Sequence, residues 1–72
     1  MKLRVRVGLN IQNLRHSRNL SQEELSLSAE IDRSYVSKIE LARFSVSLDI
    51  LEQLARALEV DPSELLAERG KR

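Results

Sequence analysis

The chain has 72 residues, a net charge of +1, 42% hydrophobic residues, no cysteine and a single histidine, His16. This length allows one domain at most, which we expect over residues 1–72 with its core at about 6–68. A domain of this size buries only about 60% of the surface that its unfolded chain exposes, so its stability is expected to be marginal or shared with a partner. Disulfides, thiolate metal sites and a zinc site built on one histidine are excluded, and no apolar run approaches the ~20 residues of a membrane helix.

Apolar residues recur with helical spacing near the start of the chain. Val7, Ile11 and Leu14 are separated by four and then three residues, which predicts one face of a helix over about residues 6–18. Asn19 is the expected left-handed residue after its end.

Two helix-start signals follow within eleven residues of each other. Ser21 stands three residues before Glu24, which is the spacing of a capping box and predicts a short helix over about 22–29. Asp32 is the expected N-cap of a third helix over about 33–41. The side chains expected to point inward from these two helices are Leu25, Ala29, Tyr35, Val36 and Ile39.

Two further helices are expected in the second half of the chain. Ser47 is the expected N-cap of a fourth helix with a strongly periodic apolar stripe. Asp61 and Glu64 predict a second capping box at the start of a short fifth helix, with Pro62 in its first position. Five short helices with short connections predict an all-α bundle. The stripe of the fourth helix consists of Leu48, Leu51, Leu54, Ala55 and Leu58.

The connection between the second and third helices is very short. Helices joined by a three- or four-residue turn cross steeply, as in a helix-turn-helix unit, so one can brace against a nucleic-acid backbone while the next projects outward. An α-helix is about 10–12 Å across and the major groove of DNA is about 12 Å wide. The third helix is therefore the candidate for base recognition.

The outward face of the third helix suits that role. A step of 100° per residue places two serines and a lysine on the side away from the core, with Arg33 at the exposed N-terminal edge and no carboxylate beyond Asp32. Arginine can bond guanine O6 and N7, and Ser and Lys can bond base edges or phosphates. Residues 1–22 also carry five cations and no Asp or Glu, which favours a polyanion as partner. Ordinary solvated surface is the alternative explanation for both patterns. The outward residues are Arg33, Ser34, Ser37 and Lys38.

Three stretches resemble a known family. "LSQEEL", "DRSYVSKIE" and "SLDILEQLARALEVDPSELL" are similar, in order and spacing, to the Cro/CI-type helix-turn-helix regulators, or XRE family, over about residues 8–67. The resemblance implies a five-helix, lambda-repressor-like DNA-binding domain whose second and third helices form the helix-turn-helix. It also implies a transcription regulator.

The resemblance assigns roles by position. Gln22 matches the family glutamine that bonds the DNA backbone, and a helix-start residue without a ligand is the alternative. Arg15 and Glu40 match an ion pair that ties the first helix to the end of the third. The residues expected to face DNA bases are Arg33, Ser34 and Lys38, with Ser37 beside them, and Arg43 resembles a phosphate contact.

The chain departs from the family pattern in its turns. Glu30 and Ala42 stand where the family often has glycine, and Val46 stands where it often has proline. A non-glycine residue in a left-handed conformation costs roughly 1 kcal/mol. Leu41 replaces a common polar residue and either meets a thymine methyl group or packs on the loop.

Within the family, "DRSYVSKIE" followed by "SVSLDILEQLA" looks most like the controller proteins of restriction-modification systems. Those proteins are single small domains that bind operators as dimers and regulate their own gene together with an endonuclease gene. The resemblance implies double-stranded operator DNA and a second copy of the chain as partners. It also leaves RNA polymerase open as a further partner. It implies no cofactor and no small-molecule ligand. The basic residues at the N-terminus are not followed by an apolar stretch, which indicates no secretory signal, so the default expectation is a cytoplasmic location without membrane contact. Tyr35 lies either near the DNA at the dimer centre or half-buried in the core.

A homodimer is expected on physical grounds as well. One recognition helix covers only a few base pairs, and two-fold pairing doubles the contacts and requires half-sites about one helical turn apart. The fourth and fifth helices carry more apolar residues than one small core needs. The expected interface residues are Val46, Ile50, Ala57, Leu65 and Leu66.

Two other classes of function compete with this interpretation. A chain this short has little room for a water-excluding cleft, and His16 has no acidic neighbour in sequence, so an enzyme is disfavoured. A phage-type repressor or an antitoxin-like protein-binding module could use the same fold. A protein-binding module predicts acidic or large apolar residues on the outward face of the third helix, where serines and cations stand.

Overall fold

The computed structural model describes residues 2–68; residue 1 and residues 69–72 lie outside this description. The described residues form five α-helices and no strand. The expected all-α bundle of five helices is confirmed. The helices are α1 (Leu3–Ser17), α2 (Gln22–Ala29), α3 (Arg33–Glu40), α4 (Leu48–Leu58) and α5 (Pro62–Leu66).

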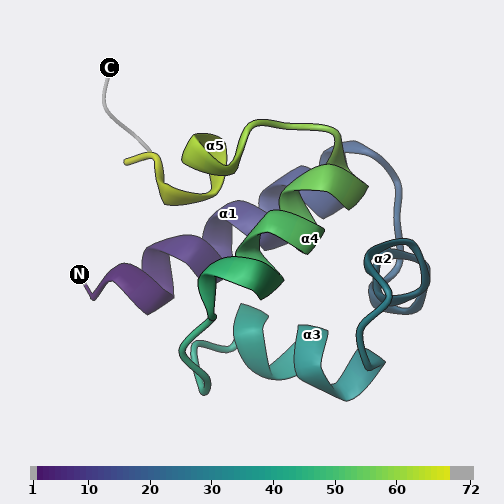
Figure 1. The fold of residues 1–72 in the computed structure, drawn as a ribbon, viewed down its shortest axis with the longest axis horizontal. Helices are drawn as coiled ribbons and strands as arrows, with labels where there is room; N and C mark the ends of the chain where they lie inside the picture. Colours follow the sequence, from purple (N-terminus) through teal and green to yellow (C-terminus); the bar gives the residue numbers. More distant parts are fainter. Residues whose placement is uncertain (1, 69–72) are drawn as a thin grey trace.

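The helices are arranged so that α3 lies at the edge of the bundle. In Figure 1, α5 and α3 lie on opposite sides of α1 and α4, and α2 is viewed almost along its axis at one end of the molecule. α1 packs against α3 and α5, and α2 packs against α3 and α4. None of the helices in the part of the chain that the structure describes combines the length and the apolar content needed to cross a membrane.

Local capping signals in the sequence correctly predicted where α2, α3 and α4 begin. The Ser21 hydroxyl accepts a hydrogen bond from the N–H of Glu24 at 3.0 Å, and the Glu24 carboxylate accepts one from the N–H of Ser21 at 2.8 Å. These two bonds complete the expected capping box. The side chains of Asp32 and Ser47 likewise each accept a backbone N–H from the first turn of the following helix.

Three helix boundaries differ from the sequence-based expectation, one of them the end of α1 at Ser17 instead of residue 18. α1 begins at Leu3, not near residue 6, although the side chain of Lys2 makes no capping bond. Because this start carries no local signal, hydrophobic spacing alone placed it too late. α3 ends at Glu40, one residue earlier than expected, with Leu41 as its C-cap.

The capping box expected at the start of α5 is absent. Asp61 accepts the N–H of Ser63 at 2.9 Å, and the N–H of Glu64 donates to the backbone oxygen of Asp61 at 2.9 Å. The expectation was wrong because an aspartate cap can serve either the second or the third N–H of a helix. Hydrogen bonds from the side chain and then the backbone of Ser63 lower the pKa of the Asp61 carboxyl below its ordinary value of 3.8.

The core is built from aliphatic side chains of all five helices. It includes the expected stripe of α4 except Leu48, which stands at the first position of the helix and is left 81% exposed by the described residues. Tyr35 is only half-buried. Leu65, expected at a dimer interface, is fully buried and is therefore corrected to a core residue. The buried apolar residues are Val7, Ile11, Leu25, Ala29, Val36, Ile39, Leu51, Leu54, Ala55, Leu58 and Leu65.

α1 is the element against which α3 and α5 are fixed. A Cβ atom on Gly8 would lie 2.6 Å from the carbonyl oxygen of Ile39 and 2.9 Å from that of Glu40, so α1 crosses the end of α3 in backbone contact. Nδ2 of the buried Asn10 donates to two carbonyl oxygens at the end of α5, at 2.9 and 2.8 Å. The close approach at Gly8 sets the position of α3 on α1, and the bonds of Asn10 set that of α5.

Candidate nucleic-acid interface

The turn between α2 and α3 is closed by Glu30 in a left-handed conformation with a φ of 61°. The N–H of Ile31 donates to the carbonyl oxygen of Ser26 at 3.0 Å, which completes the turn. Nε2 of Gln53 donates to the carbonyl oxygen of Ala29 at 2.9 Å and ties α4 to the end of α2. The chain therefore keeps the expected turn without glycine, at a cost of roughly 1 kcal/mol.

α3 presents opposite faces to the core and to solvent. Val36 and Ile39 are 0% and 1% exposed and fix the helix on the bundle. The polar side of α3 is not covered by the rest of the described chain. Its exposed residues are Arg33, Ser34 and Lys38, with Ser37 half-buried beside them.

An open hollow extends from the start of α3 to the loop that follows it. Its one carboxylate, Asp32, is engaged as the cap of α3. Leu41 also lines the hollow and is 61% exposed, so its side chain lies mostly in solvent. A surface with several cations and hydroxyl groups can bind phosphates and base edges. The other lining residues are Arg33, Ser34, Ser37, Lys38 and Arg43.

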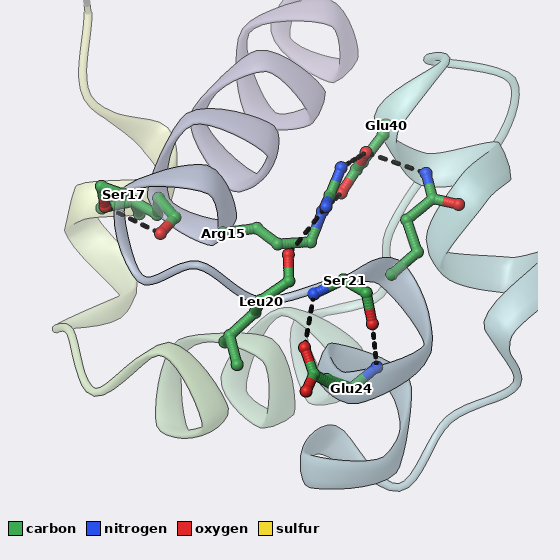
Figure 2. Close-up of polar contacts among 8 residues, drawn as sticks. Arg15, Ser17, Leu20, Ser21, Glu24 and Glu40 are labelled. Carbon is green, nitrogen blue, oxygen red and sulfur yellow. Dashed lines mark hydrogen bonds and ion pairs between the residues drawn. The ribbon is translucent and has the colours of Figure 1, made fainter.

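A buried ion pair joins α1 to the end of α3. Nε and Nη2 of Arg15 donate to the two carboxylate oxygens of Glu40 at 2.7 and 3.0 Å (Figure 2). The two side chains are only 9% and 2% exposed. Nη1 of Arg15 donates to the carbonyl oxygen of Leu20 at 2.9 Å, so the same guanidinium also holds the loop before α2 (Figure 2). The contact between Arg15 and Glu40 that the resemblance implied is present.

Gln22 shares the carboxylate of Glu40. Its Nε2 donates to Oε1 of Glu40 at 3.0 Å. A carboxylate only accepts hydrogen bonds, so the amide nitrogen of Gln22 faces Glu40, and this bond uses one of the two N–H groups on that nitrogen. Gln22 also lines a second hollow, at the start of α2, together with Ser21 and Arg33. The position of Gln22 is therefore set by the end of α3 while its second N–H stays available at the surface.

Sequence reasoning missed the position of Phe44 beside this surface. The Phe44 ring meets the ring of Tyr35 edge to face, with centroids 5.5 Å apart and an interplanar angle of 68°. Nζ of Lys38 lies 5.0 Å from the centre of the Phe44 ring. No sequence pattern predicts these contacts, because they depend on the direction of the loop after Ala42, whose φ is 61°.

Comparisons with known proteins agree with this geometry. The helix-turn-helix family model matches residues 11–65. The control protein C.BamHI of Bacillus amyloliquefaciens is 38% identical over 65 residues, which span 89% of this chain and 80% of the relative. The control protein C.MunI of Mycoplasma sp is 34% identical over 70 residues, which span 96% of this chain and 95% of the relative. The crystal structure of the restriction-modification controller protein C.AhdI from Aeromonas hydrophila matches with a TM-score of 0.84 and 40% identity, covering 86% of this chain and 94% of that one.

The matched region holds every feature of the candidate interface. Residues 11–65 include α2, α3, the turn between them and both partners of the buried ion pair. The relatives are regulators and not enzymes. The chain therefore belongs to the helix-turn-helix family and is a DNA-binding transcription regulator of the Cro/CI (XRE) type and of the restriction-modification controller kind.

Proposed function

We propose that the chain binds operator half-sites in double-stranded DNA as a homodimer, with α3 in the major groove. The observation that carries this proposal is the contrast between the two faces of α3. Its apolar residues are buried against the bundle, and its serines and cations lie on the side that faces solvent. A helix about 10–12 Å across fits a groove about 12 Å wide. The steep helix-turn-helix connection leaves α2 to brace against the DNA backbone.

Each polar group in the interface has a role in this proposal. Arg33, at the exposed start of α3, makes a bidentate bond to guanine O6 and N7. Gln22 donates its second amide N–H to a phosphate, and Arg43 places its guanidinium on the phosphates next to the recognition site. The residues that meet base edges are Arg33, Ser34 and Lys38, with Ser37 beside them.

Selection of bound sites from a random pool of duplex DNA tests the proposed function. The enriched sequence should have two-fold symmetry, with half-sites about one helical turn apart. Affinity for it should fall by about 10³–10⁵ between 50 and 200 mM salt if six to ten phosphates are contacted. A pool without enrichment, or an affinity that does not respond to salt, would contradict DNA recognition by this surface.

Two of the proposed interface residues, Val46 and Leu66, line an apolar groove between the start of α1, the start of α4 and the end of α5. Leu3, Leu48 and Leu66 line the groove and are 54%, 81% and 38% exposed. A two-fold axis at this groove would remove both copies of each leucine from water, which is favourable by roughly 25 cal/mol for each Å² of apolar surface. The proposed interface residues are Val46, Ile50, Ala57 and Leu66. We add Leu48 to them because it is exposed in this groove.

The Leu48→Glu variant should be monomeric at tens of micromolar, where we expect the wild type to be a dimer. A glutamate in the first turn of α4 is favourable for the helix, so the monomer should keep its stability. Leu27→Glu is the matched control, because Leu27 is 72% exposed on α2 and lies outside the groove. Light scattering measures both masses. A monomeric wild type, or equal masses for the wild type and Leu48→Glu, would disprove the proposed interface.

The controller relatives suggest which genes are regulated. We extend the proposal to the operators of the chain's own gene and of a restriction endonuclease gene, bound in the cytoplasm with RNA polymerase as a neighbouring partner. Tyr35 is half-buried, and its partly exposed ring is placed near the DNA at the dimer centre in this proposal.

A further inference from the structure

Phe44 lies on the surface beside α3 and contacts two residues of that helix. It is 42% exposed and is one of the two aromatic residues in the chain. Its ring centre lies 5.5 Å from that of Tyr35 and 5.0 Å from Nζ of Lys38. Phe44 is not among the buried core residues, so core packing does not account for its position.

The loop that carries Phe44 is folded back onto α3 by backbone hydrogen bonds. The N–H of Ala42 donates to the carbonyl oxygen of Ile39 at 3.0 Å, and the N–H of Arg43 donates to the carbonyl oxygen of Lys38 at 2.8 Å. Ala42 adopts a left-handed conformation, with a φ of 61°, that turns the chain. These bonds turn the loop back toward α3, so that Phe44 follows directly after a residue bonded to the backbone of Lys38.

The contact restricts a side chain that would otherwise be free. A lysine side chain has a flexible four-carbon stem, and ordering it on a ligand costs conformational entropy. An ammonium group within about 6 Å of a ring centre is attracted by the electrons of the ring face. Lys38 also lines the hollow on the outward face of α3, so the ring holds its ammonium at the edge of that hollow.

We propose that Phe44 is a positioning residue for DNA recognition: its ring holds the Lys38 ammonium at the edge of the DNA-facing surface, ordered before the DNA arrives. The inference depends on the proposed function, because it concerns the affinity of the same surface for DNA. Phe44 acts through Lys38, and its edge-to-face packing on Tyr35 keeps the ring from turning away.

A double-mutant cycle on operator affinity tests this role. Phe44→Leu keeps an apolar side chain but removes the π face, and should weaken binding about 3- to 10-fold, which corresponds to the cost of ordering one flexible side chain on the DNA. In a Lys38→Met background the same change should alter affinity by less than about 2-fold. Phe44→Trp keeps the π face and should bind the operator with wild-type affinity. All variants should have melting temperatures within a few degrees of the wild type, which excludes unfolding as the cause of weaker binding. Equal losses from Phe44→Leu in both backgrounds would overturn the proposal.

A measurement without DNA separates this inference from the proposed function. In the free protein, the ring current of Phe44 should shift the NMR signals of the Lys38 side chain upfield, and Phe44→Leu should abolish that shift. No upfield shift in the wild type would overturn the positioning role even if DNA binding is strong. Failure of the wild type to enrich any DNA sequence would instead overturn the proposed function, and the positioning role with it.

Discussion

Glu40→Ala should destabilise the fold by about 3–5 kcal/mol, because it leaves Arg15 as an unpaired charge with only 9% of its side chain exposed. Gln22 loses its acceptor in the same variant. The total stability of a chain of this size is about 4–11 kcal/mol, so the loss is a large fraction of the whole. Urea unfolding followed by circular dichroism measures the loss.

The exposed ion pair on α4 provides a matched control. Nη2 of Arg56 lies 3.9 Å from the carboxylate of Glu52, and the two side chains are 76% and 64% exposed. Glu52→Ala should therefore change stability by no more than about 0.5 kcal/mol. Replacing both members of the buried pair, as Arg15→Met with Glu40→Met, should recover most of the loss, since no charge is left buried. A double variant as unstable as Glu40→Ala would contradict the unpaired charge as the cause.

Arg33→Ala should reduce affinity for the selected operator by about 1–3 kcal/mol and relax the preference at one base position. Arg33 is exposed at the start of α3 and lines both hollows of the candidate interface, so it is placed to enter the groove first. Binding to the operator and to a panel of single-base variants, at fixed salt, measures both effects.

Arg43→Ala is the comparison for a phosphate contact. It should weaken binding to the operator and to random DNA by the same factor. The slope of log affinity against log salt concentration should also fall by about one, the effect of losing one phosphate contact. If Arg33→Ala also lowered both affinities equally, Arg33 would be a phosphate contact and its base-reading role would be wrong.

Local signals predicted most of the fold. The caps at Ser21, Asp32 and Ser47 involve residues within three positions of each other, so the sequence contains all the information that they need. The exposure of Leu48 and the burial of Leu65 depend on which helices cover the two ends of the α4–α5 unit. Helical periodicity describes the faces of one helix and not the neighbours of each face, which explains both errors.

The candidate interface was predictable on α3 and less so around it. The outward face followed from the inward positions of Val36 and Ile39, because one helix carries both faces. The pairing of Arg15 with Glu40 spans 25 positions and was available only through family resemblance. The contact of Phe44 with Lys38 depends on a left-handed alanine, which neither propensity nor periodicity reveals.

The division of α3 into two faces has a consequence for how such proteins can diversify. Val36, Ile39 and Glu40 anchor α3 to the bundle. The side chains on the opposite face of α3 are not part of the hydrophobic core. Exchanging the outer side chains should therefore retarget the protein to another operator while the scaffold stays intact. Several copies of this domain with different outer side chains would then bind different operators in one cell, and none would bind the operators of the others.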